Sequence, residues 1–202
     1  LDGTLLGNPE STRRFKDAWE ALPKSTRPML CYASGRLVQD MIDLTSALLL
    51  MARELPYAAD TTPCNAAGVV RACAEKHMHL IGGRAIRMEV ELLATPHLPV
   101  ERPLLEILVG NLIRNALFNT RSGFVLLRLE QERLTVQDSG VGMSGDELAQ
   151  VFEHYYKGAQ SVGSGVGLSL VKRICERYGW RISLDSIQGQ GTTATIYFSS
   201  LL

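Results

Sequence analysis

The sequence predicts an α/β two-layer sandwich, a mixed sheet with helices on one face, preceded by a separate helical segment. Three observations lead to this prediction. Residues 26–55 carry apolar side chains at heptad spacing, whereas residues 85–93 alternate between apolar and polar side chains. Residues 101–118 and 166–178 have the length and pattern of long helices, and short strand-like runs lie around them. This order of helices and strands is typical of helices layered on a sheet.

The composition is that of an ordinary globular protein. The chain has 202 residues, of which 46% are hydrophobic and 21% charged. Its formal net charge of +0 gives no sign of a nucleic-acid surface or of electrostatic attraction to a membrane. The 4 cysteines lie far apart, without zinc-ligand spacing, so we expect reduced thiols in a cytosolic domain. The chain begins at Leu1, and we expect it to be part of a larger protein.

Residues 1–56 are predicted to be helical. Two interleaved rows of apolar residues repeat every seven positions: Leu30, Leu37, Leu44 and Met51, then Met41, Leu48 and Leu55. Such rows form the seam of a helix in a bundle or coiled coil, although one amphipathic helix on its own domain's core would show a similar pattern. Residues 1–6 look like the end of an earlier helix, because Gly7, Asn8 and Pro9 follow. Pro56 ends the heptad helix, and residues 57–63 form a linker.

The α/β domain is predicted to span residues 64–202. Its elements are, in order, a helix over 66–81, a strand over 85–93, a helix over 101–118, a hairpin of strands 124–129 and 134–137, a helix over 166–178, and closing strands 181–186 and 193–198. Gly82 and Gly83 end the first helix, and the polar turn 130–133 joins the hairpin.

Asn111 and Asn115 lie four residues apart on the second helix of this domain, so both project from one face. An amide oxygen is a hard, neutral ligand suited to magnesium, and an amide NH2 can donate to a phosphate. Two solvent-facing polar positions on an amphipathic helix would look the same if the motif stood alone.

Asp138 follows a predicted strand and is itself followed by Gly140 and Gly142. A carboxylate at a strand end can accept a hydrogen bond from the exocyclic amine of adenine, which guanine lacks at that position. The glycines allow a tight turn and a close approach to the base. A lone Asp-Ser-Gly turn is common and would mean little.

Gly163, Gly165 and Gly167 directly precede and open the last long helix. Amide N–H groups at a helix start can face an anion, and the helix dipole favours phosphate there. The pattern is neither a Walker loop nor a Rossmann turn, and alone it could be only a flexible turn. Between this motif and Asp138, Phe152 and Tyr156 either pack in the core or anchor a short segment that closes over nucleotide.

Together these motifs resemble the four nucleotide-binding boxes of bacterial sensor histidine kinases. The quoted runs are Asn111-Leu-Ile-Arg-Asn115-Ala, Asp138-Ser-Gly140-Val-Gly142-Met143, Val151-Phe152-Glu-His-Tyr-Tyr156 and Gly163-Ser-Gly165-Val-Gly167-Leu168. The resemblance covers residues 64–199. It implies the ATP-binding sandwich shared with DNA gyrase B subunits and ninety-kilodalton heat-shock chaperones, with ATP and Mg2+ as cofactors.

The resemblance also implies a role for each matching residue. Asn115 would be the magnesium ligand, and Asn111 would act with it on the phosphate side as the second catalytic residue. The remaining residues implied in ATP binding are Asp138, Gly140, Gly142, Met143, Phe152, Tyr156, Gly163, Gly165, Val166, Gly167, Leu168 and Thr192. Asp138 would bind the adenine amine, Thr192 would help to hold the base, and the glycines around position 165 would border the phosphates.

One position favours a kinase over an ATPase. Relatives that hydrolyse ATP carry a Glu four residues before the magnesium-binding Asn, whereas this chain has Asn111, a poor general base. Phe118 and Asn119 stand where kinases usually have a basic and then an aromatic residue, with Arg114 or Arg121 as substitutes. Two alternatives to the kinase remain. One is a degenerate nucleotide-binding scaffold without turnover, which Phe118 and Asn119 would support, and the other is a stand-alone ATPase, which Asn111 disfavours.

The resemblance extends to the helical segment. Residues 1–56 look like part of the dimerisation and phosphotransfer hairpin, but His77, His79, His97 and His154 all lack the sequence context of the acceptor histidine. The implied activity is transfer of the ATP γ-phosphate to a hairpin His for relay to a response regulator Asp. We therefore expect a homodimer, a receiver-domain partner and no autophosphorylation of this chain alone. The implied location is the cytoplasmic portion of an inner-membrane sensor, attached only through parent segments outside this sequence.

Overall fold

The computed structural model describes residues 62–152 and 167–199. The chain divides into two units, Leu1–Ile42 and Asp43–Leu202, and every described residue belongs to the second. The strands are β1 (Cys64–Asn65), β2 (Ile86–Leu92), β3 (His97–Leu98), β4 (Gly123–Leu129), β5 (Arg133–Asp138), β6 (Arg181–Ile187) and β7 (Gly191–Tyr197). The helices are α3 (Ala66–His77), α4 (Arg102–Asn119), α5 (Gly145–Gln150) and α6 (Gly167–Arg177), with a short 3-10 helix η1 (Met78–Ile81).

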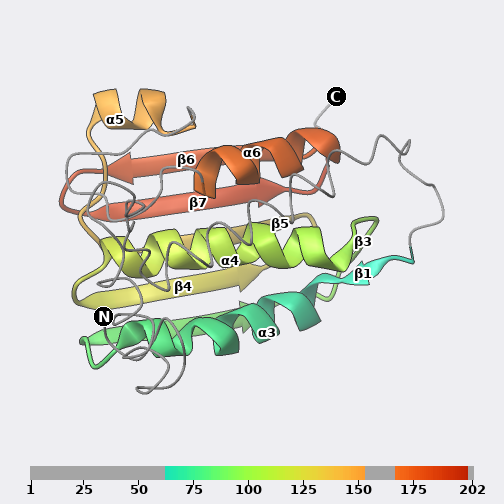
Figure 1. The fold of residues 1–202 in the computed structure, drawn as a ribbon, viewed down its shortest axis with the longest axis horizontal. Helices are drawn as coiled ribbons and strands as arrows, with labels where there is room; N and C mark the ends of the chain where they lie inside the picture. The colour runs from blue at the N-terminus through green and yellow to red at the C-terminus, as the bar shows by residue number, and fades with distance from the viewer. Residues whose placement is uncertain (1–61, 153–166, 200–202) are drawn as a thin grey trace, which may run out of the picture. The chain divides into compact units, whose positions relative to one another are not determined.

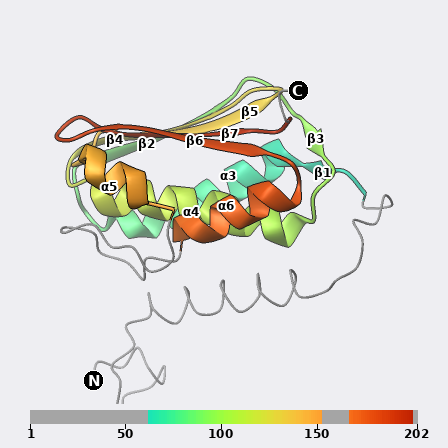
Figure 2. The same ribbon diagram turned by 90° about the horizontal axis from the view of Figure 1, so that it is seen from above.

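The main sheet has the strand order β2-β4-β5-β7-β6. β2 pairs with β4 in parallel, and the other three pairings are antiparallel, so the sheet is mixed. Helices α3, α4 and α6 lie side by side against one face of this sheet (Figures 1 and 2). This arrangement confirms the predicted α/β sandwich. The predicted helical segment 1–56 and the linker up to residue 61 lie outside the described residues.

Helix α4 is the centre of the helical layer, between α3 and α6 (Figure 1). Its buried residues are Leu104, Leu105, Leu108, Val109, Gly110, Asn111, Leu112, Ile113, Arg114, Ala116 and Leu117. A helix with neighbours on both flanks and a sheet above it is buried over most of its circumference, which explains the nearly continuous apolar run. The helix therefore holds its two site asparagines on a rigid support.

The Arg84 side chain joins the ends of two helices. Its guanidinium donates to the carbonyl oxygens of Leu117 at 2.6 Å and Thr120 at 2.7 Å, just where α4 ends. It also donates to the carbonyls of Leu80 at 2.6 Å and Ile81 at 3.1 Å in η1. Carbonyls at a helix C-terminus lack partners within the helix and carry partial negative charge, so one cation satisfies both ends.

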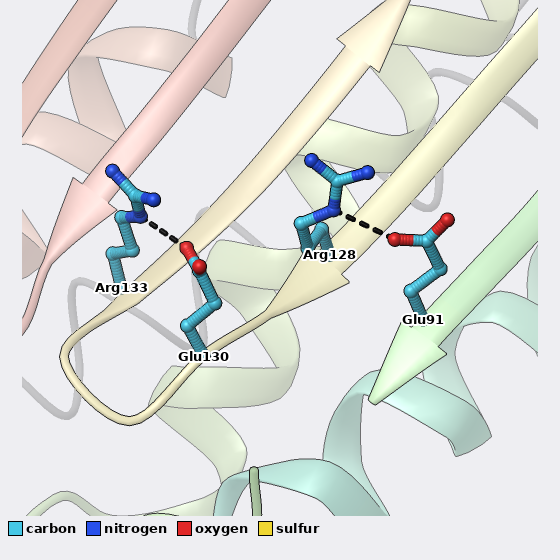
Figure 3. Close-up of polar contacts among 4 residues, drawn as sticks. All are labelled: Glu91, Arg128, Glu130 and Arg133. Carbon is cyan, nitrogen blue, oxygen red and sulfur yellow. Dashed lines mark hydrogen bonds and ion pairs between the residues drawn. The ribbon is translucent and has the colours of Figure 1, made fainter. Parts of the chain in front are cut away.

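The face of the sheet away from the helices is polar and carries ion pairs between exposed side chains. Arg128 of β4 donates to Glu91 of β2 at 2.6 Å, and Arg133 pairs with Glu130 across the hairpin turn (Figure 3). Exposed pairs of this kind contribute little to stability. The period-2 alternation of β4 places Val125, Leu127 and Leu129 on the opposite face, in the core.

Helix α5 was not expected from the sequence. Ser144 caps it by accepting from the Glu147 amide at 3.3 Å, and the Glu147 carboxylate accepts from the Ser144 amide at 2.9 Å. This reciprocal pair is a capping box, whose Ser-x-x-Glu spacing is readable in the sequence. The two-residue strands β1 and β3 were also missed, since so short a pairing leaves no periodicity to detect.

Candidate nucleotide-binding site

Asn111 and Asn115 share a face of α4, as predicted, and α6 begins directly against them. A Cβ placed on Gly167 would lie 2.8 Å from Asn111 Oδ1 and 3.8 Å from Asn115 Oδ1. A side chain at this position would require the Asn111 amide to shift, whereas glycine leaves it in place. The structure therefore brings together both asparagines and the start of α6, the helix that the glycine-rich motif precedes.

The two asparagines differ in what their amides already contact. Asn111 is buried, its Nδ2 donates to the Ile107 carbonyl at 2.8 Å, and its Oδ1 accepts from the Arg114 guanidinium at 3.0 Å. Both ends of its amide are thus bonded within α4. Asn115 is half-buried and lies one turn nearer the end of the helix. Arg114 is itself buried beside Asn111, so it is an internal partner rather than an exposed substitute for the missing basic residue.

The end of α4 is joined to the loop that follows β5. The Asn119 carbonyl accepts from the Val141 amide at 3.1 Å, and the Asn119 side chain turns back to donate to the Asn115 carbonyl at 2.8 Å. A Cβ on Gly140 would lie 2.3 Å from the Asn119 carbonyl oxygen, a distance that no side chain tolerates. The asparagine helix and the aspartate loop therefore have a fixed relative position.

Asp138 lies at the end of β5, where the prediction placed it, and is buried. Its Oδ1 accepts from the Gly140 amide at 2.8 Å. Burial raises the pKa of the Asp138 carboxyl to about 6, and backbone hydrogen bonds from Gly140 and Thr192 oppose that rise. A buried carboxylate is stabilised when a donor forms a hydrogen bond with it. The amine of a nucleobase is such a donor.

Thr192 pairs with Asp138 across β5 and β7, so the two side chains project from the same face of the sheet. The loop after Asp138 is shaped by Gly142, which has φ 61° and whose Cβ would lie 2.0 Å from the Ile187 carbonyl oxygen. Met143 donates its amide N–H to Ser186 Oγ at 2.8 Å. The Asp138 loop is thus held between the end of α4 and the β6–β7 hairpin.

Sequence reasoning missed Ser186. Its hydroxyl contacts the Met143 amide, the Gly191 carbonyl and the Thr192 hydroxyl. A signal was available, because Ile182, Leu184 and Ser186 share the inward face of one strand, and a polar residue at an inward position requires partners.

The remaining predicted residues fall into two groups. Leu168 is half-buried and packs against the core, and the Phe152 ring lies 5.6 Å from Lys172 Nζ of α6. Phe152 thus contacts the helix that begins at the phosphate-side motif. Four predicted residues lie outside the described part of the chain: Tyr156, Gly163, Gly165 and Val166.

Comparison with known proteins places the chain in a family. Residues 101–201 match the family model of the histidine kinase-, DNA gyrase B-, and HSP90-like ATPases, and the chain belongs to that family. Within it, the chain is the ATP-binding catalytic part of a bacterial sensor histidine kinase. The solved mycobacterial sensor histidine kinase MprB is 26% identical with a TM-score of 0.60, over 67% of this chain and 94% of that one.

Two further likenesses cover different shares of the chain. Sensor histidine kinase GacS of Pseudomonas protegens is 27% identical over 208 residues, 93% of this chain and 21% of that protein. The chain thus spans about a fifth of that relative. A separate likeness, 52% over 44 residues, is to mannosylfructose-phosphate phosphatase of Agrobacterium fabrum, covering 22% of this chain and 18% of that protein.

Proposed function

We propose that this domain binds ATP with Mg2+ and presents the γ-phosphate to a histidine of a phosphotransfer hairpin. The observation that carries the proposal is the junction of two half-sites at the end of α4. Asn115 and Gly167 form one half, Asp138 and Thr192 the other, and the Asn119–Val141 hydrogen bond joins them. A purine at the aspartate would direct its phosphates along the asparagine helix.

The residues of the first half-site fit a hydrated magnesium ion. Asn115 offers a neutral oxygen on a rigid helix, and magnesium is usually held by one or two protein oxygens plus phosphates and water. Bound magnesium would neutralise charge on the phosphates. Asn111, whose amide is bonded to Ile107 and Arg114, would order the helix face against which Gly167 packs. Neither asparagine is a base that would activate water, which supports phosphotransfer over hydrolysis.

Nucleotide binding is tested by calorimetry of the chain with ATP, with and without magnesium. We expect magnesium-dependent binding in the micromolar range, roughly −7 to −8 kcal/mol. Asn115→Ala should remove the magnesium dependence, whereas Asp138→Asn should weaken binding with or without the metal. Absence of ATP binding in the unmodified chain would favour the degenerate scaffold, with Phe118 and Asn119 as the first positions to revert.

Phosphotransfer has its own test. We expect no labelling of this chain alone with γ-labelled ATP, because no acceptor histidine precedes its heptad helix, and labelling of a separate acceptor hairpin added in trans. Release of inorganic phosphate without an acceptor, abolished by Asn115→Ala, would instead support the ATPase alternative.

Residues 1–56 are proposed to be the end of the phosphotransfer hairpin, making the parent a homodimer that passes phosphate to a receiver domain. The alignment with GacS supports this, since 93% coverage leaves only about 14 of 202 residues unmatched. A hairpin of this kind predicts a dimer, and sedimentation measures whether the chain forms one.

We also propose that the chain is the cytoplasmic portion of an inner-membrane sensor. Among residues 62–152 and 167–199, no helix is both long and apolar enough to cross a membrane. Any attachment would lie in other segments of the parent, and fractionation of cells that express the full-length parent tests this location.

A further inference from the structure

Ser186 lies at the junction of three segments that surround the proposed adenine site. Its Oγ accepts from the Met143 amide at 2.8 Å, lies 3.1 Å from the Gly191 carbonyl oxygen, and lies 2.9 Å from Thr192 Oγ1. The three partners come from the loop after β5 and from the first two residues of β7. One hydroxyl therefore connects the loop and the strand that flank Asp138.

The number of protons available limits which group can donate in each of the three Ser186 contacts. A serine hydroxyl has one proton to donate and two lone pairs that accept. The Met143 N–H can only donate, and the Gly191 carbonyl can only accept. The contact with Thr192 is the one link in which either atom can be the donor. Its direction is therefore set by where the single Ser186 proton goes.

Burial favours the Gly191 carbonyl as the recipient. Gly191 is buried and Thr192 is half-buried, so the carbonyl has less access to water than the Thr192 hydroxyl. In the 3.1 Å contact the carbonyl can only accept, so Ser186 is the donor there. Ser186 then donates to Gly191, and Thr192 must donate its own proton to Ser186.

We propose that Ser186 is a positioning residue that sets nucleobase specificity, because it takes up the Thr192 proton and leaves Thr192 only lone pairs to offer to the base. Thr192 faces the same side of the sheet as Asp138. Both would then present acceptors to the exocyclic amine of adenine, and a carbonyl at that position would meet lone pairs. The inference rests on the proposed binding of adenine at Asp138.

Removal of the Ser186 hydroxyl frees the Thr192 proton. Thr192 could then donate to a carbonyl, so discrimination against inosine triphosphate, which carries a carbonyl in place of the adenine amine, should fall. Loss of the Met143 contact would weaken binding of both nucleotides alike. The ratio of the two dissociation constants separates the specificity effect from that general loss.

The experiment is calorimetry of the full chain with ATP and with inosine triphosphate, for the unmodified protein, Ser186→Ala, Ser186→Thr and Thr192→Val. We expect the preference for ATP to fall roughly three- to tenfold in Ser186→Ala, the scale of one hydrogen bond. Ser186→Thr, which keeps the hydroxyl, should retain the preference. In the Thr192→Val background, Ser186→Ala should change the ratio no further.

An unchanged ratio in Ser186→Ala, with both affinities reduced alike, would overturn the proposal and leave the nucleotide site intact. Failure of the unmodified chain to bind ATP would instead reject the adenine site and the inference together. Thermal melting checks that each variant is folded. If Ser186→Ala does not fold, Ser186→Cys has nearly the same shape with a weak donor and acceptor, and the same loss of preference is expected.

Discussion

At the scale of single residues, the site is characterised by a buried acid. Asp138 is 7% exposed, and its pKa is raised to about 6 from 3.8 by burial. The charged form is therefore disfavoured in the folded protein without nucleotide, although it is the form that accepts a hydrogen bond from an amine. Burial of the charged form thus lowers stability, and under the proposed function Asp138 would contribute to binding of the base.

The first prediction concerns stability and pH. Asp138 is protonated in both states below pH 3.8, and between 3.8 and about 6 the unfolded chain loses that proton first. The stabilising contribution of the protonated form is therefore lost as pH rises through about 6. Asp138→Asn removes this dependence, so its stability relative to the unmodified chain should rise by on the order of 1–3 kcal/mol between about pH 4.5 and 7.5. Urea unfolding measures the difference.

The matched control for that experiment is Asp185→Asn on β6, an exposed carboxylate of the same sheet. It should show no comparable rise with pH. Equal stability differences for Asp138→Asn at both pH values would contradict the assigned burial of the carboxyl.

A second prediction concerns nucleotide affinity. Asp138→Asn should weaken ATP binding by roughly 1.5–3 kcal/mol near pH 7.5, the scale of a charge-assisted hydrogen bond. Asp185→Asn should leave the affinity as it is. Calorimetry compares the two, and unchanged affinity in Asp138→Asn would mean that the base lies elsewhere.

At the scale of elements, the site depends on how helix ends and loops meet. The end of α4 is held by two sets of hydrogen bonds. Arg84 donates to the carbonyls of Leu117 and Thr120, and the Val141 amide donates to the Asn119 carbonyl. The loop after β5 is further held by close backbone approaches at Gly140 and Gly142. Substitutions that disturb these junctions should therefore affect the site through the backbone.

The third prediction tests the Arg84 junction. Arg84→Met keeps the length of the side chain but leaves carbonyls at two helix ends without a donor, including that of the fully buried Thr120. We expect a loss of roughly 2–4 kcal/mol in the free energy of unfolding. Arg87→Met is the control, because the Arg87 side chain is 75% exposed. Comparable losses in the two variants would show that Arg84 has no special role.

The fourth prediction tests the loop. In Gly142→Ala the new Cβ would lie 2.0 Å from the Ile187 carbonyl oxygen, at a φ of 61°. We expect a destabilisation of roughly 1–3 kcal/mol and weaker ATP binding. Gly145→Ala is the control, since its Cβ would meet nothing within 4 Å. Retained stability and affinity in Gly142→Ala would show that the loop tolerates a different path.

At the scale of the whole molecule, the described domain is one layer of helices on one sheet, and the chain is about a fifth of the length of GacS. The described domain holds many of the proposed nucleotide-binding residues, and none of its histidines has the sequence context of an acceptor. Under the proposed function, phosphotransfer requires a second element, and the heptad rows of residues 26–55 are where the sequence predicts its contact.

The fifth prediction tests that contact. Leu44→Asp would place a charge on the heptad seam and should convert a dimer to a monomer in sedimentation velocity. Leu93→Asp is the control, because Leu93 is 64% exposed in the described domain. A monomeric unmodified chain, or a dimer that survives Leu44→Asp, would reject the proposed hairpin.

The sequence by itself determined the elements and the residue types of the site. Strand alternation and the asparagine spacing follow from backbone geometry, which acts over a few residues, so β2, α4 and the position of Asp138 could be read directly. Helix α5 was also readable from its capping box. It was not predicted, because its residues were assigned to the short segment proposed to close over nucleotide.

Only the tertiary structure decided which groups meet. The Arg84 junction with the end of α4 and the contact of Ser186 with the Met143 amide are not visible in any local pattern. Hydrogen-bond partners, burial and the raised pKa of Asp138 are set by groups far apart in the chain, such as Asp138 and Thr192. The spacing of residues within a helix or strand determines the face from which a side chain projects. The packing of one element against another determines which groups that side chain contacts.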